Sequence, residues 1–321
     1  MIILAGGVMD ARNKTMTVTG PLVVNGTYTS DDNSAKDLSF SGDSLGGSGT
    51  IAINDAARYL NIASDVVIIP GTQLHIFGNI YIRNNVTATN KGHIEVSGNI
   101  DGQDASGSVW TQFDDSELEI AGSLLGTGSL NPSASGNSVT YLLQGPQDIK
   151  TPASSTYYDL SISGSDIKTI NADLVIDNDL LISSGTLDGN NYDIELNGDW
   201  NNESDFLEGN GTVMFNGTAN QKISNPSGEQ FFGLTVNKSS GNLILETDVV
   251  VANTLIMTSG QIEAQSGKLT LGTGLAMPGA VVYTAGHIYG SFERWISAAG
   301  TYTYPVGSSV NVQFLYITLN G

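Results

Sequence analysis

Two stretches of this sequence repeat each other and decide its fold. Residues 138–162 read SVTYLLQGPQDIKTPASSTYYDLSI, and residues 212–236 read TVMFNGTANQKISNPSGEQFFGLTV. They align without a gap at an offset of 74, which places Gln147 on Gln221. Apolar positions keep their register while the residues between them change freely. This is the pattern expected of core-facing side chains in stacked repeat units.

The repeat continues after one inserted residue. Residues 171–196 (NADLVIDNDLLISSGTLDGNNYDIEL) match residues 246–271 (ETDVVVANTLIMTSGQIEAQSGKLTL) at an offset of 75. The two copies of this long repeat therefore span residues 138–211 and 212–272.

A finer spacing lies within each copy. Apolar positions recur after 21 residues, from Leu234 to Leu255, and after 20 residues, from Val249 to Leu269. Short alternating apolar stretches between Gly, Asn, Ser and Thr are typical of strands and turns, and amphipathic helical spacing does not occur. A coil of about 20 residues with three short strands, each pairing with its counterpart one coil away, indicates an all-β, parallel β-solenoid.

Both ends of the chain differ from its middle. We expect residues 1–40 to form an N-terminal strand or cap region and residues 41–272 to form the solenoid. Residues 273–321 carry most of the late aromatic residues and break the coil spacing. Because a solenoid end needs cover against edge-to-edge growth, we interpret this last region as a β-rich cap or small β domain.

The alternative fold is an array of antiparallel β-sandwiches joined by hairpins. Asn197-Gly198 and Asn216-Gly217 are credible hairpin turns, since Asn-Gly suits the tightest two-residue connections. The recurrence after about 20 residues favours the solenoid.

Composition excludes several classes of protein. The 321 residues carry 32 acidic and 12 basic side chains, a net charge of −20, which repels phosphate backbones and argues against a nucleic-acid partner. The chain has no cysteine, so disulfides and thiolate sites are impossible. Its apolar stretches are far shorter than the roughly 20 residues of a transmembrane helix. Gly, Asn, Ser and Thr together make 129 residues, and stacked Asn side chains are expected to hydrogen-bond along the solenoid as amide ladders.

Two segments carry a family resemblance. The repeat text from GTVMFNGTANQKISN onward, and GHIYGSFERWISAAGTYTYPVGSS at 286–309, resemble repetitive secreted surface proteins of Bacteroidetes, which are large β-rich adhesins and filament proteins. Together the two segments cover about residues 138–309. The resemblance implies an extracellular or cell-surface location and a structural or adhesive role. Residues 1–13 lack the features of a secretory signal, which implies that a signal was removed or that the chain is an internal fragment.

An enzyme is the main alternative, because β-helices also carry polysaccharide lyases and glycosidases. Carboxylates are plentiful, but Asp173 recurs as Asp248 at the same repeat position, which suits a turn better than a single catalytic point. The histidines His75, His93 and His287 are far apart in sequence. We therefore expect no catalytic residues and no cofactor. A polysaccharide-active enzyme or a carbohydrate-binding module remains the alternative.

Calcium is the one metal that the sequence suggests. Hard cations bind where several carboxylate oxygens converge. The candidate ligands are Asp177, Asp179, Asp188 and Asp193, in the runs DND and DGNNYD. Neither run matches an EF-hand loop, and solvated turns are the better explanation of such clusters.

The candidate interface residues lie at the two ends of the chain. Arg294 and Trp295 belong to the residue types that dominate binding hot spots, although the core of a cap would use the same residues. Apolar segments at 1–4 and 312–319 are candidates for unpaired strands that extend a neighbouring subunit's sheet. The candidates in these segments are Ile2, Ile3, Leu4, Phe314, Leu315 and Tyr316.

The sequence thus predicts a structural subunit of an extracellular filament or adhesin stalk that associates with itself end to end. Head-to-tail contacts that do not close produce fibres, so the expected partner is a second copy of the chain. A surface glycan or host receptor is a further expected partner, and a phage fibre is a third possibility for the function.

Overall fold

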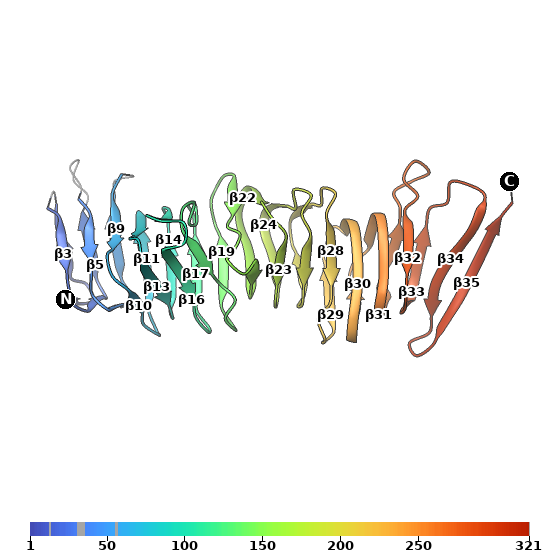
Figure 1. Cartoon of the computed structure of the whole chain (residues 1–321), viewed down its shortest axis with the longest axis horizontal. Helices are drawn as coiled ribbons and strands as arrows, with labels where there is room; N and C mark the ends of the chain where they lie inside the picture. The colour runs from blue at the N-terminus through green and yellow to red at the C-terminus, as the bar shows by residue number, and fades with distance from the viewer. Residues whose placement is uncertain (13, 31–35, 55–56, 321) are drawn as a thin grey trace. The chain divides into compact units, whose positions relative to one another are not determined.

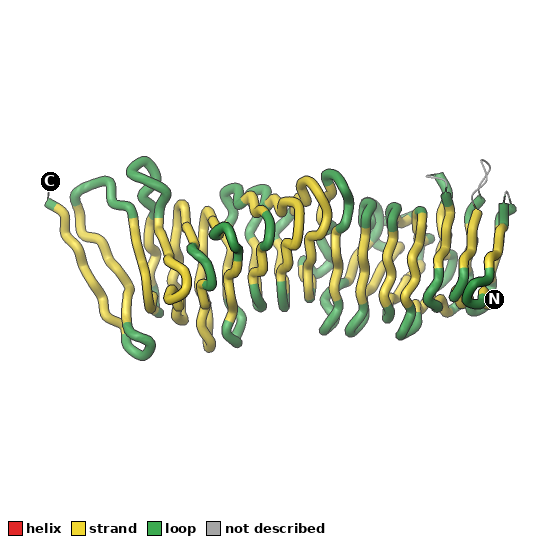
Figure 2. Tube along the Cα trace, turned by 180° about the vertical axis from the view of Figure 1, so that it is seen from behind, coloured by secondary structure: helices red, strands yellow, loops and turns green. Residues whose placement is uncertain are grey.

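The computed structural model describes residues 1–12, 14–30, 36–54 and 57–320, and these residues form strands and turns with no helix (Figure 2). The chain divides into two compact units, Met1–Lys168 and Thr169–Gly321. Both are built of stacked coils of about 21 residues, about 14 coils in the described parts of the chain. The predicted parallel β-solenoid is confirmed. No described segment is a helix able to cross a membrane.

Three parallel sheets form the first unit. Figure 1 shows strands of this unit side by side from β3 to β19. Sheet A contains β1 (Ile2–Ile3), β4 (Leu22–Val24), β7 (Ser44–Gly46), β10 (Val66–Ile68), β13 (Val86–Asn90), β16 (Ser108–Gln112) and β18 (Ser129–Asn131). Sheet B contains β2 (Val8–Asp10), β5 (Thr27–Ser30), β8 (Thr50–Ile53), β11 (Gln73–Phe77), β14 (His93–Val96), β17 (Glu117–Ile120), β19 (Ser138–Tyr141), β20 (Gln147–Ile149), β21 (Thr156–Tyr157) and β22 (Asp159–Ile170), within which the division between the units falls. Sheet C contains β3 (Met16–Val18), β6 (Leu38–Phe40), β9 (Tyr59–Ile62), β12 (Asn79–Ile82) and β15 (Ile100–Gly102).

Side chains in each short strand alternate between the inside of the coil and its surface, and the inward side chains build the core of this unit. On β11 the side chain of Ile76 is buried, and it pairs with Ile51 one coil back and with Val96 one coil on. Each fully buried aliphatic side chain contributes roughly 1.5–3 kcal/mol relative to exposure. Stacks of this kind recur from coil to coil, so the core is one apolar column enclosed by the three sheets.

The second unit uses longer strands. It contains β23 (Leu174–Ile176), β24 (Leu180–Asp188), β25 (Ile194–Leu196), β26 (Trp200–Asn202), β27 (Asp205–Leu207), β28 (Thr212–Phe215), β29 (Gln221–Ser224), β30 (Glu229–Leu245), β31 (Val249–Leu271), β32 (Ala280–Tyr283), β33 (His287–Arg294), β34 (Gly300–Gly307) and β35 (Val312–Leu319). Strands β30 and β31 pass through coil corners without a break, and register shifts in their pairing mark those corners. The described strand pairs in this unit are parallel except β34–β35, and an isolated antiparallel bridge joins Gly274 to Met277 outside the strands.

The Asn-Gly pairs are not hairpin turns, and the sandwich alternative is wrong. The described strand pairings between residues 138 and 272 are parallel. A Cβ atom on Gly198 would lie 2.2 Å from the carbonyl oxygen of Asn178, one coil back, and one on Gly217 would lie 1.9 Å from that of Asn197. The glycines therefore allow two coils to approach closely at a corner.

Both copies of the long repeat place equivalent residues in equivalent surroundings. Gln147 and Gln221 are buried, and the Nε2 atom of each donates hydrogen bonds to two backbone carbonyls of the preceding coil. In the pairs Tyr157-Tyr158 and Phe231-Phe232 the first ring is buried and the second is half-buried. One ring of each pair therefore packs into the core and the other lies at the surface.

Candidate interaction surface

The hairpin of β34 and β35 is the antiparallel part of the second unit. Its register runs from Gly300 opposite Leu319 to Gly307 opposite Val312. Among the described residues, β34 is the one strand whose register with β35 is defined, and the outer edge of β35 has no partner strand. Backbone N–H and C=O groups along that edge are therefore available to another strand.

The sequence of β35 leaves this edge unprotected. Its residues, VQFLYITL, include no charged residue and no proline, which are the usual devices that prevent edge-to-edge pairing. Phe314 is 42% exposed, Leu315 50% and Tyr316 61%. Large side chains thus remain in solvent on an uncharged strand of 8 residues, which makes it the candidate interaction surface.

Aromatic contacts hold the hairpin from one face. The ring of Phe314 meets that of Tyr283 edge-on, with ring centroids 5.0 Å apart, and stacks against Tyr316 at 6.0 Å. Burial raises the pKa of the Tyr283 hydroxyl, so the ring stays neutral across the physiological range. The exposed residues of β35 are therefore carried on a strand that packing holds in place.

Arg294 fastens the other strand of the hairpin. Its guanidinium lies 5.1 Å from the ring centroid of Tyr302 and 5.8 Å from that of Tyr304, and its Nη1 donates to the carbonyl of Thr303 at 3.1 Å. Cation–π contacts of this kind contribute about 0.5–2 kcal/mol. The neighbouring Trp295 is 42% exposed. Of the predicted pair, Arg294 therefore positions the hairpin and Trp295 offers a contact surface.

The first coil of the first unit carries the other predicted interface residues. Ile2 is 67% exposed and Leu4 is 71% exposed, whereas Ile3 is buried. Strand β1 pairs with β4 on one side, and among the described residues no strand pairs with its other side. The alternation of the strand therefore leaves Ile2 and Leu4 accessible and assigns Ile3 to the core.

The four candidate calcium ligands accept hydrogen bonds from the chain itself. Asp179 accepts the backbone N–H of Asp199 at 2.7 Å, and Asp193 accepts that of Thr212 at 2.7 Å. Asp177 accepts the Nδ2 of Asn197, and Asp188 accepts the backbone N–H of Asn190. Within the described ranges, no group of three or more His, Asp or Glu side chains is arranged to hold a metal ion. The structure thus gives these carboxylates a role in joining coils and shaping turns.

Sheet B brings together two histidines that are distant in sequence. His75 on β11 lies 3.5 Å from Glu95, and His93 on β14 lies 3.2 Å from Glu117 and 3.8 Å from Glu119. These are partly exposed pairs, which typically contribute no more than about 1 kcal/mol each. The strand register gives lengths of 20 and 24 residues for the two coils involved. With these lengths, the sequence alone would place the histidines and glutamates side by side.

Sequence reasoning missed the full extent of the exposed surface on and near the hairpin. Val282, Val310, Val312 and Leu319 are each at least 41% exposed. Val312 and Leu319 lie within the apolar segment 312–319 that the sequence indicated, whereas Val282 and Val310 lie outside it, so that segment could not reveal them.

Comparisons of the chain with protein-family models, with curated proteins and with solved structures gave no match. The geometry of the coils and of the hairpin therefore carries the argument about function.

Proposed function

We propose that this chain is a non-catalytic structural subunit of an extracellular filament or adhesin stalk, and that its copies join end to end through the free edge of β35. The observation that carries the proposal is the uncharged, exposed edge strand at Val312–Leu319. A strand that is both apolar and unpaired is a template for pairing with another strand.

The energetics favour pairing through this strand. Each backbone hydrogen bond formed at the edge contributes a net of about 0.5–1.5 kcal/mol, and burial of Phe314, Leu315 and Tyr316 adds a hydrophobic term. The chain carries a net charge of −20, so most surfaces of two copies repel each other. Because β35 carries no charge, pairing along it brings no charges of the same sign together.

The partner strand that we propose is β1 of a second copy. Its outer side pairs with no strand in the described structure, and Ile2 and Leu4 present apolar side chains beside it. A contact between β35 of one copy and β1 of the next is heterologous. Contacts of this type leave the same two surfaces free at the ends of the assembly, so they propagate into a fibre.

Electron microscopy and light scattering of the purified chain test the proposal. We expect fibres, or a mass that grows with concentration, for the wild-type chain. The variant Leu315→Lys should remain a monomer, because it places a charge in the joint. Leu207→Lys is the matched control, since Leu207 is 47% exposed in the same unit but lies on β27. A wild-type chain that stays monomeric at every concentration, or a Leu315→Lys variant that assembles normally, would contradict the proposal.

In the first coil, the position of an introduced charge decides whether the variant tests folding or assembly. Ile3 is buried, so a charge there would test folding and not assembly. Leu4 is 71% exposed, and Leu4→Lys is therefore the informative substitution at the first coil. We expect it to reduce fibre length while the melting temperature stays within a few degrees of wild type.

A further inference from the structure

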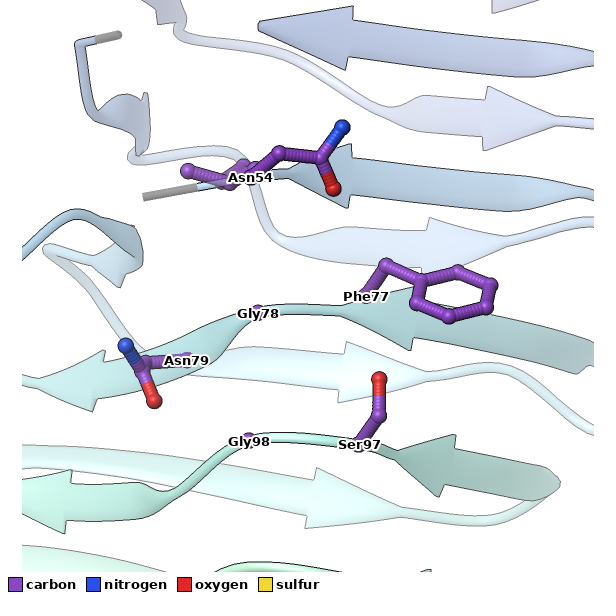
Figure 3. A pocket seen from close by; sticks show the side chains of 7 residues that line it. Asn54, Phe77, Gly78, Asn79, Ser97 and Gly98 are labelled. Atoms are coloured by element: carbon purple, nitrogen blue, oxygen red, sulfur yellow. The ribbon is translucent and has the colours of Figure 1, made fainter. Parts of the chain in front are cut away.

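A shallow groove lies on the first unit where strands of sheet B end (Figure 3). It has a volume of about 250 Å³. The residues that line it come from the ends of β8 and β11, the turns after β8, β11 and β14, and the first residue of β12: Ile53, Asn54, Phe77, Gly78, Asn79, Ser97 and Gly98. None of its lining residues belongs to β1 or to the hairpin of β34 and β35.

Two glycines form the floor of the groove. A Cβ atom on Gly98 would lie 2.4 Å from the carbonyl oxygen of Gly78, so the stacking of coils at this corner requires glycine. The same requirement removes side chains from the surface. Gly78, which lies between Phe77 and Asn79 in Figure 3, and Gly98 are both half-buried, so backbone without a side chain contributes to the surface of the groove.

Phe77 provides an aromatic wall. Its side chain is 45% exposed although the residue lies on a well-packed strand. It pairs across the sheet with the small Ala52, and Figure 3 shows it beside Ser97. The ring stacks on His75, with centroids 4.1 Å apart and an interplanar angle of 28°. Small neighbours leave the ring accessible, and His75 holds its orientation.

The polar groups of the groove are neutral. The Ser97 hydroxyl donates to the carbonyl of Ile76 at 3.2 Å, so its oxygen can still accept a hydrogen bond. Asn79 is fixed, because its Oδ1 accepts the backbone N–H of Asn99 and its Nδ2 donates to Arg58. Asn54 is exposed and carries both donor and acceptor. No charged side chain is among the lining residues described.

We propose that this groove binds one residue of a neutral saccharide. A pyranose ring offers an apolar C–H face and a rim of hydroxyl groups. The C–H face would lie against Phe77, and hydroxyl groups would exchange hydrogen bonds with Asn54 and Ser97. An anionic sugar finds no cation among the lining residues, and the net charge of −20 repels it. Occupancy of this groove does not depend on end-to-end association.

Saturation-transfer NMR on the full chain tests this inference. The probes are neutral cellopentaose, mannopentaose and galactopentaose, with an oligogalacturonate as the acidic comparator. We expect signal transfer to at least one neutral probe and a loss of at least about fivefold in Phe77→Ala. Phe113→Ala is the matched control, because Phe113 is 42% exposed in the same unit but lies under the ammonium of Lys91. It should bind like wild type.

A second variant separates binding from folding. Asn54→Ala changes only an exposed side chain, so the fold should be unaffected, and we expect binding to weaken severalfold. Signal transfer to no neutral probe, equal binding by Phe77→Ala and wild type, or preference for the acidic comparator would overturn the inference. Because these readouts are independent of fibre formation, a failure here is distinguishable from a failure of the proposed assembly.

Discussion

The Oδ1 atom of Asp173 accepts the backbone N–H of Asp193, 20 residues further along the chain, at 2.9 Å. Asp193 in turn accepts the backbone N–H of Thr212. The same arrangement links Asn79 to Asn99 and Asn99 to Ser123 in the first unit. Side-chain oxygens at coil corners thus satisfy the N–H groups of the next coil. The expected amide ladders are largely replaced by these side-chain-to-backbone links, since a corner N–H has no partner within its own strand.

Removing one of these links should destabilise the second unit by a modest amount. Asp193→Ala leaves the N–H of Thr212 without its acceptor, and we expect a loss of about 1–3 kcal/mol. Asp193→Asn keeps an acceptor oxygen and should recover most of that loss. Urea unfolding of the three proteins measures the difference. Equal stability of Asp193→Ala and wild type would show that solvent replaces the link at no cost.

Calcium should leave the melting temperature unchanged. Asp177, Asp179, Asp188 and Asp193 already accept hydrogen bonds from the chain, so a cation would have to displace those donors. Differential scanning calorimetry with 5 mM calcium and with EDTA measures the melting temperature in both states. A bound ligand at 100 times its Kd would raise the free energy of unfolding by about 2.7 kcal/mol. A rise of several degrees in calcium would assign these carboxylates to a metal site instead.

A methyl group at a glycine corner should disrupt coil stacking. The Cβ of Gly122→Ala would lie 2.2 Å from the carbonyl oxygen of Gly98, one coil back. We expect a loss of about 1–3 kcal/mol, the usual cost of overpacking. Gly20→Ala is the matched control, because its Cβ would have no neighbour within 4 Å. If thermal melting shows equal effects of the two substitutions, the close approach of neighbouring coils does not explain why position 122 is glycine.

The buried Lys238 should make stability depend on alkaline pH. Its Nζ donates to the carbonyls of Gly217 and Ala219 and to Oε1 of Gln221. Burial lowers the pKa of Lys238 to about 8, against an ordinary value of 10.5, and Asp199 partly offsets this. Between these two pH values the unfolded chain binds the proton and the folded chain does not, so the stability contributed by this group rises with pH.

The variant Lys238→Met removes this dependence. The difference in melting temperature between wild type and Lys238→Met should therefore shift in favour of wild type from pH 7.5 to pH 9.5. Lys222 is the control, since its ion pair with Glu246 raises its pKa, and its contribution is lost only at higher pH. A difference that is flat across this window, or that shifts against wild type, would contradict the lowered pKa of Lys238.

The internal repeat predicted the register of the core well. Val139 and Val213, and Leu160 and Leu234, are buried as paired positions of the repeat. Alternation of apolar residues on a strand depends on local sequence, and the recurrence after about 20 residues supplies the coil length. These two signals are enough to specify parallel stacking.

Apolar alternation and repeat spacing did not predict the two buried lysines. Lys168 donates to the carbonyls of Leu143 and Gly145, and Lys238 donates to those of Gly217 and Ala219, which are the equivalent positions at the repeat offset of 74. The two lysines themselves are not equivalent in the alignment. Two different sequence positions thus satisfy the same orphan carbonyls, and no pattern based on apolar spacing detects that requirement.

The candidate surface was predicted in part. The uncharged sequence of β35 indicated an edge strand, but its exposure on both faces follows from antiparallel pairing with β34, which a parallel coil pattern does not predict. The groove at Phe77 depends on glycines in two neighbouring coils, Gly78 and Gly98, which the coil spacing brings together. Sequence position alone separates them by 20 residues.

Site-directed cross-linking between copies tests the association of β35 with β1. The chain has no cysteine, so a single introduced cysteine is a unique label. Chains carrying Val312→Cys are mixed with chains carrying Leu4→Cys and treated with a short bismaleimide. We expect mixed dimers that contain one chain of each kind. Cross-linking only between two Val312→Cys chains, or no cross-linking at concentrations where the wild-type chain assembles, would contradict it.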